Sequence, residues 1–354
     1  MSSDAATTAV VVDDSNFMRI VIGDILESGG IEVVATASDG AEAVRVVEQH
    51  DPDVVTMDVE MPGVGGIEAV ERIMATHPTP ILMLSAHTEE GASVTFEAIE
   101  RGAVDFFTKP GGEISAGMAR FEEQLVEQVH SVAKSSVGPD GVGSSPGHVH
   151  TEIPAADFEA NPTLVVGAST GGPHAVERLL SDLPLAADFR VLVVQHMPEG
   201  FTGRFAERLD GVSDYVVREA RDAIRVAGGE AVVARGGSHL RASNYRRGKV
   251  TLELTDEPAR HGVRPAIDVT MESVATVVDD PLVAVILTGM GRDGAAGVER
   301  VKAAGGVVVA QDEATSAVFG MPKQAIETGC VDTVEPLSGI PRAVVQSIVR
   351  EAPA

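Results

Sequence analysis

The sequence predicts an α/β protein with two globular units, each built on a doubly wound sheet of parallel strands. Short runs rich in Val and Ile alternate with amphipathic stretches in both halves of the 354-residue chain, which is typical of strands buried between helices. Between the halves, from Lys134 to Asn161, the periodicity disappears and Gly, Pro, Ser and acidic residues dominate. Such a composition indicates a linker.

The N-terminal half contains five apolar runs, each followed by a helical pattern. We expect strands at Ala9–Val12, Ile31–Ala35, Asp53–Met57, Pro80–Leu84 and Val104–Phe107, and helices near 16–28, 40–49, 65–76, 90–101 and 113–133. Five βα units in succession predict one doubly wound sheet.

The C-terminal half repeats the pattern with longer intervals. Strands are expected at Leu164–Gly167, Val191–Gln195, Val283–Leu287 and Val307–Ala310, and helices near 173–181, 200–209, 266–277, 294–303 and 339–350. The stretch 231–254 alternates around glycine-rich breaks, which predicts a hairpin at one edge of this sheet. We therefore divide the chain into a domain at 7–130, a flexible linker at 131–161 and a domain at 162–350.

The charge balance excludes one class of partner. The chain has 53 Asp and Glu against 27 Lys and Arg, a formal net charge of −26, so nucleic acid or an anionic membrane surface would repel it. Arginine largely replaces lysine among the cations. We interpret this composition as adaptation to a cytoplasm with very high salt, as in a halophilic archaeon; the alternative is an acidic protein from an ordinary cell.

Three further features predict a cytoplasmic protein with no direct membrane insertion. The only cysteine, Cys330, excludes internal disulfides and fits a reducing compartment. The N-terminus lacks the basic and apolar regions of a signal peptide. No apolar run approaches the roughly 18 to 20 residues that span a bilayer.

Polar residues follow four of the predicted strands of the first half. Asp13 and Asp14 follow the first strand, Asp58 the third, Ser85 the fourth and Lys109 the fifth. The carboxyl ends of parallel strands meet at one edge of the sheet, and clustered carboxylates suit Mg²⁺ together with a phosphoryl oxygen. Asp58 is then placed to accept a phosphoryl group, with Lys109 and Ser85 able to contact it.

These residues occur in the motifs VVVDDS, MDVEMPGVGG, LSA and FFTKP, which resemble a response-regulator receiver domain with a flavodoxin-like sheet. The resemblance implies that Asp58 is phosphorylated from a chemotaxis histidine kinase. It also implies that Asp14, Asp58 and the carbonyl of Glu60 bind Mg²⁺, that Asp13 assists through water, and that Ser85 and Lys109 respond to the phosphoryl group. The competing interpretation is that these acids merely belong to a very acidic chain.

A glycine-rich turn opens the second half. In GASTGGP, Ser169 follows an apolar strand and precedes a helix, so its hydroxyl stands beside amides that could stabilise an oxyanion. A phosphate-binding loop or a plain helix cap would have the same local sequence.

Two more polar residues are expected at the same sheet edge. His196 follows the next strand directly, and Asp293 follows a later one. Together with Ser169 they supply a nucleophile, a general base and a carboxylate that orients the base. Taken separately, His196 could lie in a hydrogen-bonded core, Asp293 could cap the helix that begins at Gly294, and Ser169 could be a turn residue. We expect His261, which is not at a strand end, to be a surface or structural residue.

The motifs VVGASTGGP, VVQHMPEGFTGRFAERL, ILTGMGRDGAAG and AQDEATSAVFGMPKQAIETG resemble the catalytic domain of the chemotaxis methylesterase (CheB) family. The resemblance implies hydrolysis of glutamate methyl esters, and deamidation of glutamines, on methyl-accepting chemotaxis receptors. It implies no cofactor for ester hydrolysis, catalytic roles for Ser169, His196 and Asp293, and supporting roles for Thr170 and Met290 near the oxyanion. In that family the unphosphorylated receiver covers the catalytic site.

Two other functions remain open from the residues alone. One is a receiver-coupled serine hydrolase that acts on another ester or amide. The other is a noncatalytic response regulator that binds a nucleotide through GASTGG. Methanol release from methylated receptors distinguishes the methylesterase from both.

Overall fold

The computed structural model describes residues 6–85, 89–109, 118–135, 158 and 160–349. The chain divides into two compact units, Met1–Ser145 and Pro146–Ala354, and each is described by itself. Most of the predicted linker, 136–157, lies outside the described residues. The last helix of the first unit ends at Ala133, so its final turn extends into the segment assigned to the linker.

The first unit is a five-stranded sheet in the order β2-β1-β3-β4-β5, and every pair of neighbouring strands is parallel. Its strands are β1 (Thr8–Val12), β2 (Glu32–Ala37), β3 (Val54–Asp58), β4 (Ile81–Ser85) and β5 (Asp105–Thr108), with helices α1 (Asn16–Ser28), α2 (Gly40–His50), α3 (Gly66–Thr76), α4 (Glu89–Glu100) and α5 (Met118–Ala133). All five predicted strands and helices are confirmed, except that 113–117 of the last helix lies outside the described residues. This is the doubly wound order whose strand reversal, beside β1 and β3, creates a crevice at the carboxyl edge.

Local sequence explains the helix starts of the first unit. The side chain of Ser15 accepts a hydrogen bond from the amide of Met18 and begins α1. Asp39 accepts from the amide of Glu42, whose carboxylate returns to the amide of Ser38, in the manner of a capping box. These caps begin α1 and α2 directly after β1 and β2, and α1 follows the strand end that carries Asp13 and Asp14.

The second unit contains a seven-stranded sheet in the order β15-β14-β13-β6-β7-β10-β8, in which all neighbours are parallel. Its strands are β6 (Thr163–Ala168), β7 (Arg190–Gln195), β8 (Val216–Glu219), β10 (Glu230–Val233), β13 (Leu282–Ile286), β14 (Val307–Gln311) and β15 (Thr333–Glu335). A separate antiparallel sheet contains β9 (Ile224–Val226), β11 (His239–Arg246) and β12 (Lys249–Thr255).

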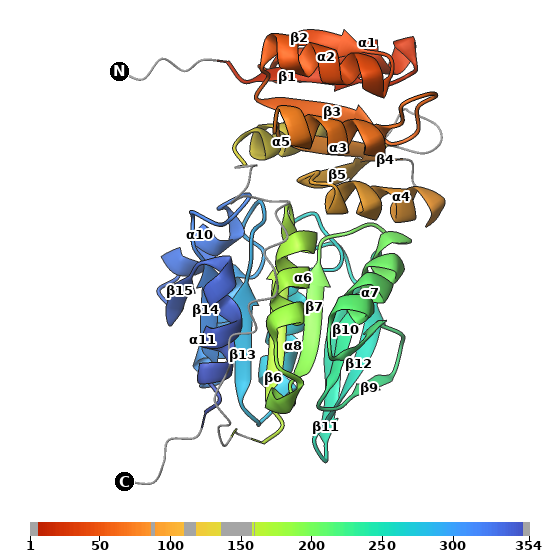
Figure 1. The fold of residues 1–354 in the computed structure, drawn as a ribbon. Helices are drawn as coiled ribbons and strands as arrows, with labels where there is room; N and C mark the ends of the chain where they lie inside the picture. The colour runs from red at the N-terminus through yellow and green to blue at the C-terminus, as the bar shows by residue number, and fades with distance from the viewer. Residues whose placement is uncertain (1–5, 86–88, 110–117, 136–157, 159, 350–354) are drawn as a thin grey trace. The chain divides into compact units, whose positions relative to one another are not determined.

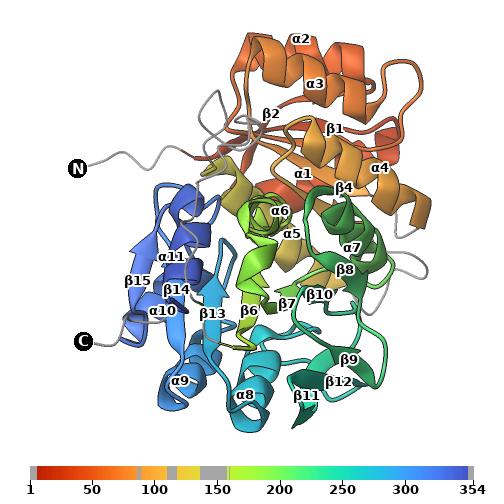
Figure 2. The same ribbon diagram turned by 60° about the horizontal axis from the view of Figure 1, so that its bottom comes forward.

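Helices cover both faces of the seven-stranded sheet (Figures 1 and 2). On one face lie α6 (Gly172–Asp182), α7 (Phe201–Val212) and α11 (Ile340–Gln346), and on the other lie α8 (Ile267–Val277) and α9 (Ala295–Ala303). A short helix, α10 (Met321–Glu327), and two 3-10 turns, Leu185–Ala187 and Leu337–Gly339, complete the unit. None of the helices in these described ranges combines the length and apolarity that a bilayer crossing requires.

The predicted hairpin exists, but its position differs from the prediction. Strands β11 and β12 pair through a turn at 247–248, and they belong to the separate three-stranded sheet rather than to the edge of the parallel sheet. The start of the same stretch forms β10, which pairs in parallel with β7 and β8. Strands β8, β9 and β15 were not predicted, because runs of three or four residues carry little periodicity.

Strand β6 lies near the middle of the sheet, between β13 and β7, so the residues that follow these three strands are neighbours in space. Gly167 lets a helix pack closely against this region: a Cβ added there would lie 2.7 Å from Cγ2 of Ile267. The first turn of α8 is therefore held against the end of β6.

Candidate active site and phosphoryl site

The turn after β6 brings Ser169 to the edge of the sheet. Gly171 has a left-handed backbone (φ 71°), which turns the chain into α6. Gly289 packs directly on the serine, since a Cβ at position 289 would lie 2.7 Å from Cβ of Ser169. The Thr288 carbonyl accepts a hydrogen bond from the Ser169 amide at 3.0 Å. These contacts fix the main chain of the predicted nucleophile.

The predicted base and carboxylate are hydrogen-bonded to each other. His196 follows β7, and its Nε2 lies 2.8 Å from Oδ2 of Asp293. The His196 amide donates to the Ala168 carbonyl (3.0 Å), so the residue stands beside Ser169. Within the described ranges no hydrogen bond joins the Ser169 hydroxyl to His196. Catalytic hydrogen bonds of this kind are often long before substrate binds.

The amides of the Ser169 turn differ in their partners. The Ser169 amide donates to Thr288, and the Gly172 amide donates to the Ser169 carbonyl at 2.7 Å. The Thr170 amide has no acceptor among the backbone hydrogen bonds of the described chain, whereas the Thr170 carbonyl accepts from Oγ1 of Thr288 at 2.9 Å. The Thr170 N–H is therefore available to an oxyanion. Met290 is half-buried in the loop from β13 to Asp293.

Gln195 contacts the main chain of both predicted catalytic residues, and the sequence interpretation missed it. This buried side chain ends β7. Its Nε2 donates to the carbonyl of Ser169 (2.8 Å) and to that of His196 (3.3 Å), while its Oε1 has no hydrogen-bond partner among the described residues. The only signal in the sequence was an amide within the last residues of an otherwise apolar strand.

Asp293 is buried at the start of a helix, although not the helix that the sequence suggested. Its Oδ2 also accepts from the amide of Ile267 (2.7 Å), and its Oδ1 accepts from the amide of Asp268 (3.0 Å). It thus caps α8 rather than α9, and holds His196 with the same carboxylate. Burial alone would raise the pKa of Asp293, but the hydrogen bond and charge of His196 and the two amides outweigh burial and leave the pKa below its ordinary value.

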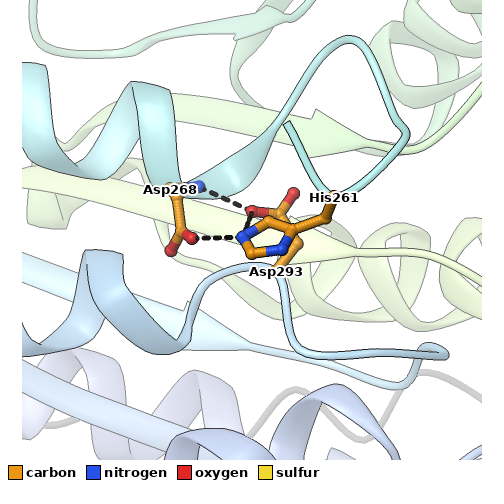
Figure 3. A group of neighbouring side chains, drawn as sticks. All are labelled: His261, Asp268 and Asp293. Atoms are coloured by element: carbon orange, nitrogen blue, oxygen red, sulfur yellow. Dashed lines mark hydrogen bonds and ion pairs between the residues drawn. The ribbon is translucent and has the colours of Figure 1, made fainter. Parts of the chain in front are cut away.

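His261 and Asp268 lie against this carboxylate, as Figure 3 shows. Nε2 of His261 is 2.8 Å from Oδ2 of Asp268 and 4.0 Å from Oδ1 of Asp293. His261 is partly exposed, whereas Asp268 is fully buried. The sequence predicts a surface or structural role for His261 and does not single out Asp268, because neither residue follows a strand.

The first unit has a second polar site at the carboxyl edge of its sheet. One oxygen each of Asp13, Asp14 and Asp58 lie within 4.8 Å of one another. Nζ of Lys109 is 2.8 Å from Oδ2 of Asp13 and 2.8 Å from Oδ1 of Asp58. Four of the predicted receiver residues are therefore brought together by three strand ends.

Burial and the neighbouring charges have opposite effects on the pKa values of Asp58 and Lys109. Burial raises the pKa of Asp58, and the hydrogen bond and charge of Lys109 only partly offset it. Burial alone would lower the pKa of Lys109, but its bonds to Asp13 and Asp58 raise the pKa overall. The oxygen-rich donor set of three carboxylates fits a hard divalent cation such as Mg²⁺.

Ser85 and Glu60 border the acidic site. Ser85 is fully buried at the end of β4, and its hydroxyl accepts a hydrogen bond from Oγ1 of Thr95 at 2.8 Å. Its carbonyl accepts from the Lys109 amide at 2.8 Å. Glu60 is exposed and follows Asp58, the last residue of β3, by two positions.

The folds and sites define a class of two-domain α/β protein. In the first domain, three carboxylates and a lysine cluster at the carboxyl edge of the sheet. In the second domain, Ser, His and Asp follow three neighbouring strands. Comparison with known families agrees with this class. Residues 164–344 match the family model "CheB methylesterase", and residues 9–116 match "Response regulator receiver domain". The chain belongs to the CheB methylesterase family and has an N-terminal receiver domain.

Relatives from several organisms match nearly the whole chain. A protein of Haloarcula marismortui is 58% identical, with 97% of this chain and 98% of that protein covered. One of Thermotoga maritima is 42% identical, with 98% of this chain and 100% of the relative covered. Both are named protein-glutamate methylesterase/protein-glutamine glutaminase. The crystal structure of the Thermotoga maritima CheB methylesterase catalytic domain matches with a TM-score of 0.50 and 40% identity, covering 54% of this chain and 98% of that one.

Proposed function

We propose that this protein is a phosphorylation-activated methylesterase that hydrolyses glutamate methyl esters, and deamidates glutamines, on methyl-accepting chemotaxis receptors. The observation that carries the proposal is the hydrogen bond of 2.8 Å between His196 and Asp293, beside Ser169, in a chain of the CheB methylesterase family. The family membership does not favour a nucleotide-binding regulator or a hydrolase of unrelated specificity.

The site supports an acyl-transfer mechanism with Ser169 as the nucleophile. Because Nε2 of His196 is engaged by Asp293, Nδ1 is the nitrogen that would take the proton of the Ser169 hydroxyl. Oγ of Ser169 then bonds to the carbonyl carbon of the substrate, and the negative charge moves to the carbonyl oxygen. The free N–H of Thr170 would stabilise this oxyanion, and Met290 would line the same pocket.

His196 returns its proton to the leaving group in the second half of each reaction. The C–O bond of the ester breaks and methanol leaves, or the C–N bond of a glutamine amide breaks and ammonia leaves. Water then attacks the acyl-serine, His196 again accepts and returns a proton, and a glutamate is released. Asp293 stabilises the imidazolium that forms in each step. The residues need no cofactor for this chemistry.

The receiver site supports control by phosphorylation at Asp58, with a chemotaxis histidine kinase as the phosphodonor. Asp13, Asp14, Asp58 and the Glu60 carbonyl would hold Mg²⁺, which neutralises charge as a phosphoryl group is transferred. Lys109, now bound to both Asp13 and Asp58, would contact the phosphoryl group, and the Ser85 hydroxyl would hydrogen-bond to it.

Methanol release tests the catalytic half of the proposal. Wild-type protein and Ser169→Ala are incubated with membranes that contain methyl-labelled receptors, and volatile label is counted. Wild type should release methanol and Ser169→Ala should not. Release that persists in Ser169→Ala would refute the assignment of the nucleophile.

Phosphodonor stimulation tests the regulatory half. Asp58→Asn should keep the basal rate of methanol release and lose the increase that acetyl phosphate causes in wild type. A normal increase in Asp58→Asn would show that Asp58 is not the phosphoacceptor.

A further inference from the structure

Two aspartates cap two helices in a crossed arrangement. Asp293, which precedes α9, accepts hydrogen bonds from the amides of Ile267 and Asp268 in the first turn of α8. Asp268 in turn accepts, through Oδ1, from the amides of Gly294 (3.0 Å) and Gly297 (2.7 Å) at the start of α9. Each carboxylate thus accepts hydrogen bonds from first-turn N–H groups that have no acceptor within their own helix, Asp293 for α8 and Asp268 for α9. Neither aspartate can shift without breaking bonds at both helices.

The glycines of α9 make room for this arrangement. A Cβ added at Gly297 would lie 2.8 Å from Cβ of Met271 and 3.2 Å from Oδ1 of Asp268. Gly294 has a left-handed backbone (φ 98°), which lets the chain turn into α9 directly after Asp293. The contact between the two helices is therefore close enough for Asp268 to fix the position of the 293–294 peptide.

Charged groups surround the pair of aspartates. Two buried carboxylates would repel each other without compensation. His196 faces Asp293 from the loop after β7, and His261 faces both aspartates from the loop before α8. Nη2 of Arg260 lies 3.4 Å from Oδ2 of Asp268, and Glu272 of α8 holds Arg260 through two bonds of 2.8 Å.

We propose that Asp268 is a positioning residue of the methylesterase reaction and that His261 supports it. Asp268 holds Asp293 in line with His196 through the first turns of α8 and α9. Its charge also adds to that of Asp293 when His196 becomes an imidazolium. The inference rests on the proposed function, since it concerns the same site. A displacement of about 1 Å in such a group costs roughly 100-fold in rate.

Three variants of the full-length protein separate position from charge. Asp268→Asn keeps an acceptor oxygen for the α9 amides and removes the charge, whereas Asp268→Ala removes both. Asp279→Asn is the matched control, because it makes the same exchange at an exposed residue just after the end of α8. For each variant, kcat and KM are measured for methanol release and for hydrolysis of p-nitrophenyl acetate, with thermal unfolding and a profile over about pH 5 to 9.

The expected effects are on kcat. Asp268→Asn should lower kcat about 10-fold with little change in KM, and Asp268→Ala about 100-fold with a lower melting temperature. The acid limb of the kcat profile should move to lower pH in Asp268→Asn, because the imidazolium loses a nearby negative charge. Asp279→Asn should stay within about twofold of wild type.

His261 provides a second route to the same test. Because its side chain is 30% exposed, its variants put folding at little risk. His261→Ala should lower kcat a few-fold, and His261→Gln, whose amide can still donate to Asp268, should restore most of it.

Two results would overturn the inference: wild-type kcat and pH profile in Asp268→Asn, or an equal loss in Asp279→Asn. Hydrolysis of p-nitrophenyl acetate tests the positioning role independently of the proposed receptor substrate. Wild type that hydrolyses p-nitrophenyl acetate through Ser169 but releases no methanol from receptors would refute the substrate assignment. The comparison of the Asp268 variants would still decide the positioning role.

Discussion

Asp293→Asn changes one atom of a carboxylate that accepts three hydrogen bonds. Oδ2 accepts from Nε2 of His196 and from the amide of Ile267, and Oδ1 accepts from the amide of Asp268. An asparagine offers one acceptor oxygen. If that oxygen takes the place of Oδ2, the new NH₂ group faces the Asp268 N–H, donor against donor. At least one buried amide of α8 then lacks an acceptor, which costs about 1 to 3 kcal/mol of unfolding free energy.

The effect on catalysis should be larger than the effect on stability. His196 would keep its hydrogen bond to position 293, but the charge that stabilises the imidazolium would be gone. In serine hydrolases this exchange lowers kcat by about 10⁴, which corresponds to about 5.5 kcal/mol in the transition state. We expect a loss of roughly 10³ to 10⁴ in kcat for methanol release.

Stability should also lose part of its pH dependence. The pKa of Asp293 is lower in the folded protein than its ordinary value. Its contribution is therefore fully present above about pH 4, the pKa of an unfolded aspartate, and is lost as pH falls from there through the lower folded pKa. In Asp293→Asn, the part of the loss of unfolding free energy at acid pH that comes from protonation of Asp293 should be absent.

The assay compares wild type, Asp293→Asn and the control Asp279→Asn, which makes the same exchange at an exposed residue close to the end of α8. Methanol release gives kcat, and urea unfolding between about pH 3 and 7 gives the stability difference. If Asp293→Asn kept more than about a tenth of the wild-type kcat, Asp293 would not stabilise the base.

Three more predictions follow from the two sites and from the composition. Gln195→Leu should lower kcat about 10-fold, because the carbonyls of Ser169 and His196 lose their shared donor. Its unfolding free energy should change by less than about 1 kcal/mol, since the unpartnered Oε1 is removed as well; unchanged kcat in steady-state kinetics would contradict this role. EDTA should abolish stimulation by acetyl phosphate and leave basal methanol release intact, and a loss of the basal rate would place a metal in ester hydrolysis. The melting temperature should rise as KCl increases from about 0.1 to 3 M, because salt screens a net charge of −26; calorimetry that shows no rise would favour an ordinary acidic protein.

The sequence was sufficient to predict the strands that carry the two sites. Buried parallel strands such as β3 and β6 are nearly continuous apolar runs, and the polar residue at the end of each run falls at a known edge of the sheet. This rule selected Asp58, Ser169 and His196 without knowledge of strand order. The seven-stranded order itself depends on pairings between segments far apart in the chain, which no local pattern records.

The rest of the site lacked a local signal for a physical reason. Asp268 lies in the first turn of α8, where an acidic residue is ordinary because it favours the helix dipole. His261 lies in a loop between a hairpin and a helix, and its partner is seven residues away. These residues become functional candidates because α8 and α9 pack against each other in the fold. That contact requires glycines in α9, and only the packing shows that a side chain at these positions would not fit.

Burial distinguishes four carboxylates of the two sites from the many exposed acids of this chain, although Asp14 of the acidic site is exposed. A charged carboxylate is rarely buried unless hydrogen bonds or opposite charges compensate for lost water. Of the 53 acidic residues, the buried ones in the described ranges are Asp13, Asp58, Asp105, Asp268 and Asp293. Asp105 accepts a hydrogen bond from Nε2 of Gln128. Of the other four, Asp13 and Asp58 lie at the acidic site of the first unit, Asp293 is bonded to His196, and the amide of Asp268 is bonded to Asp293. Composition cannot mark these four in so acidic a chain. Their burial, with cations and helix amides arranged around them, is the physical reason to assign Asp268 to the reaction together with Asp293.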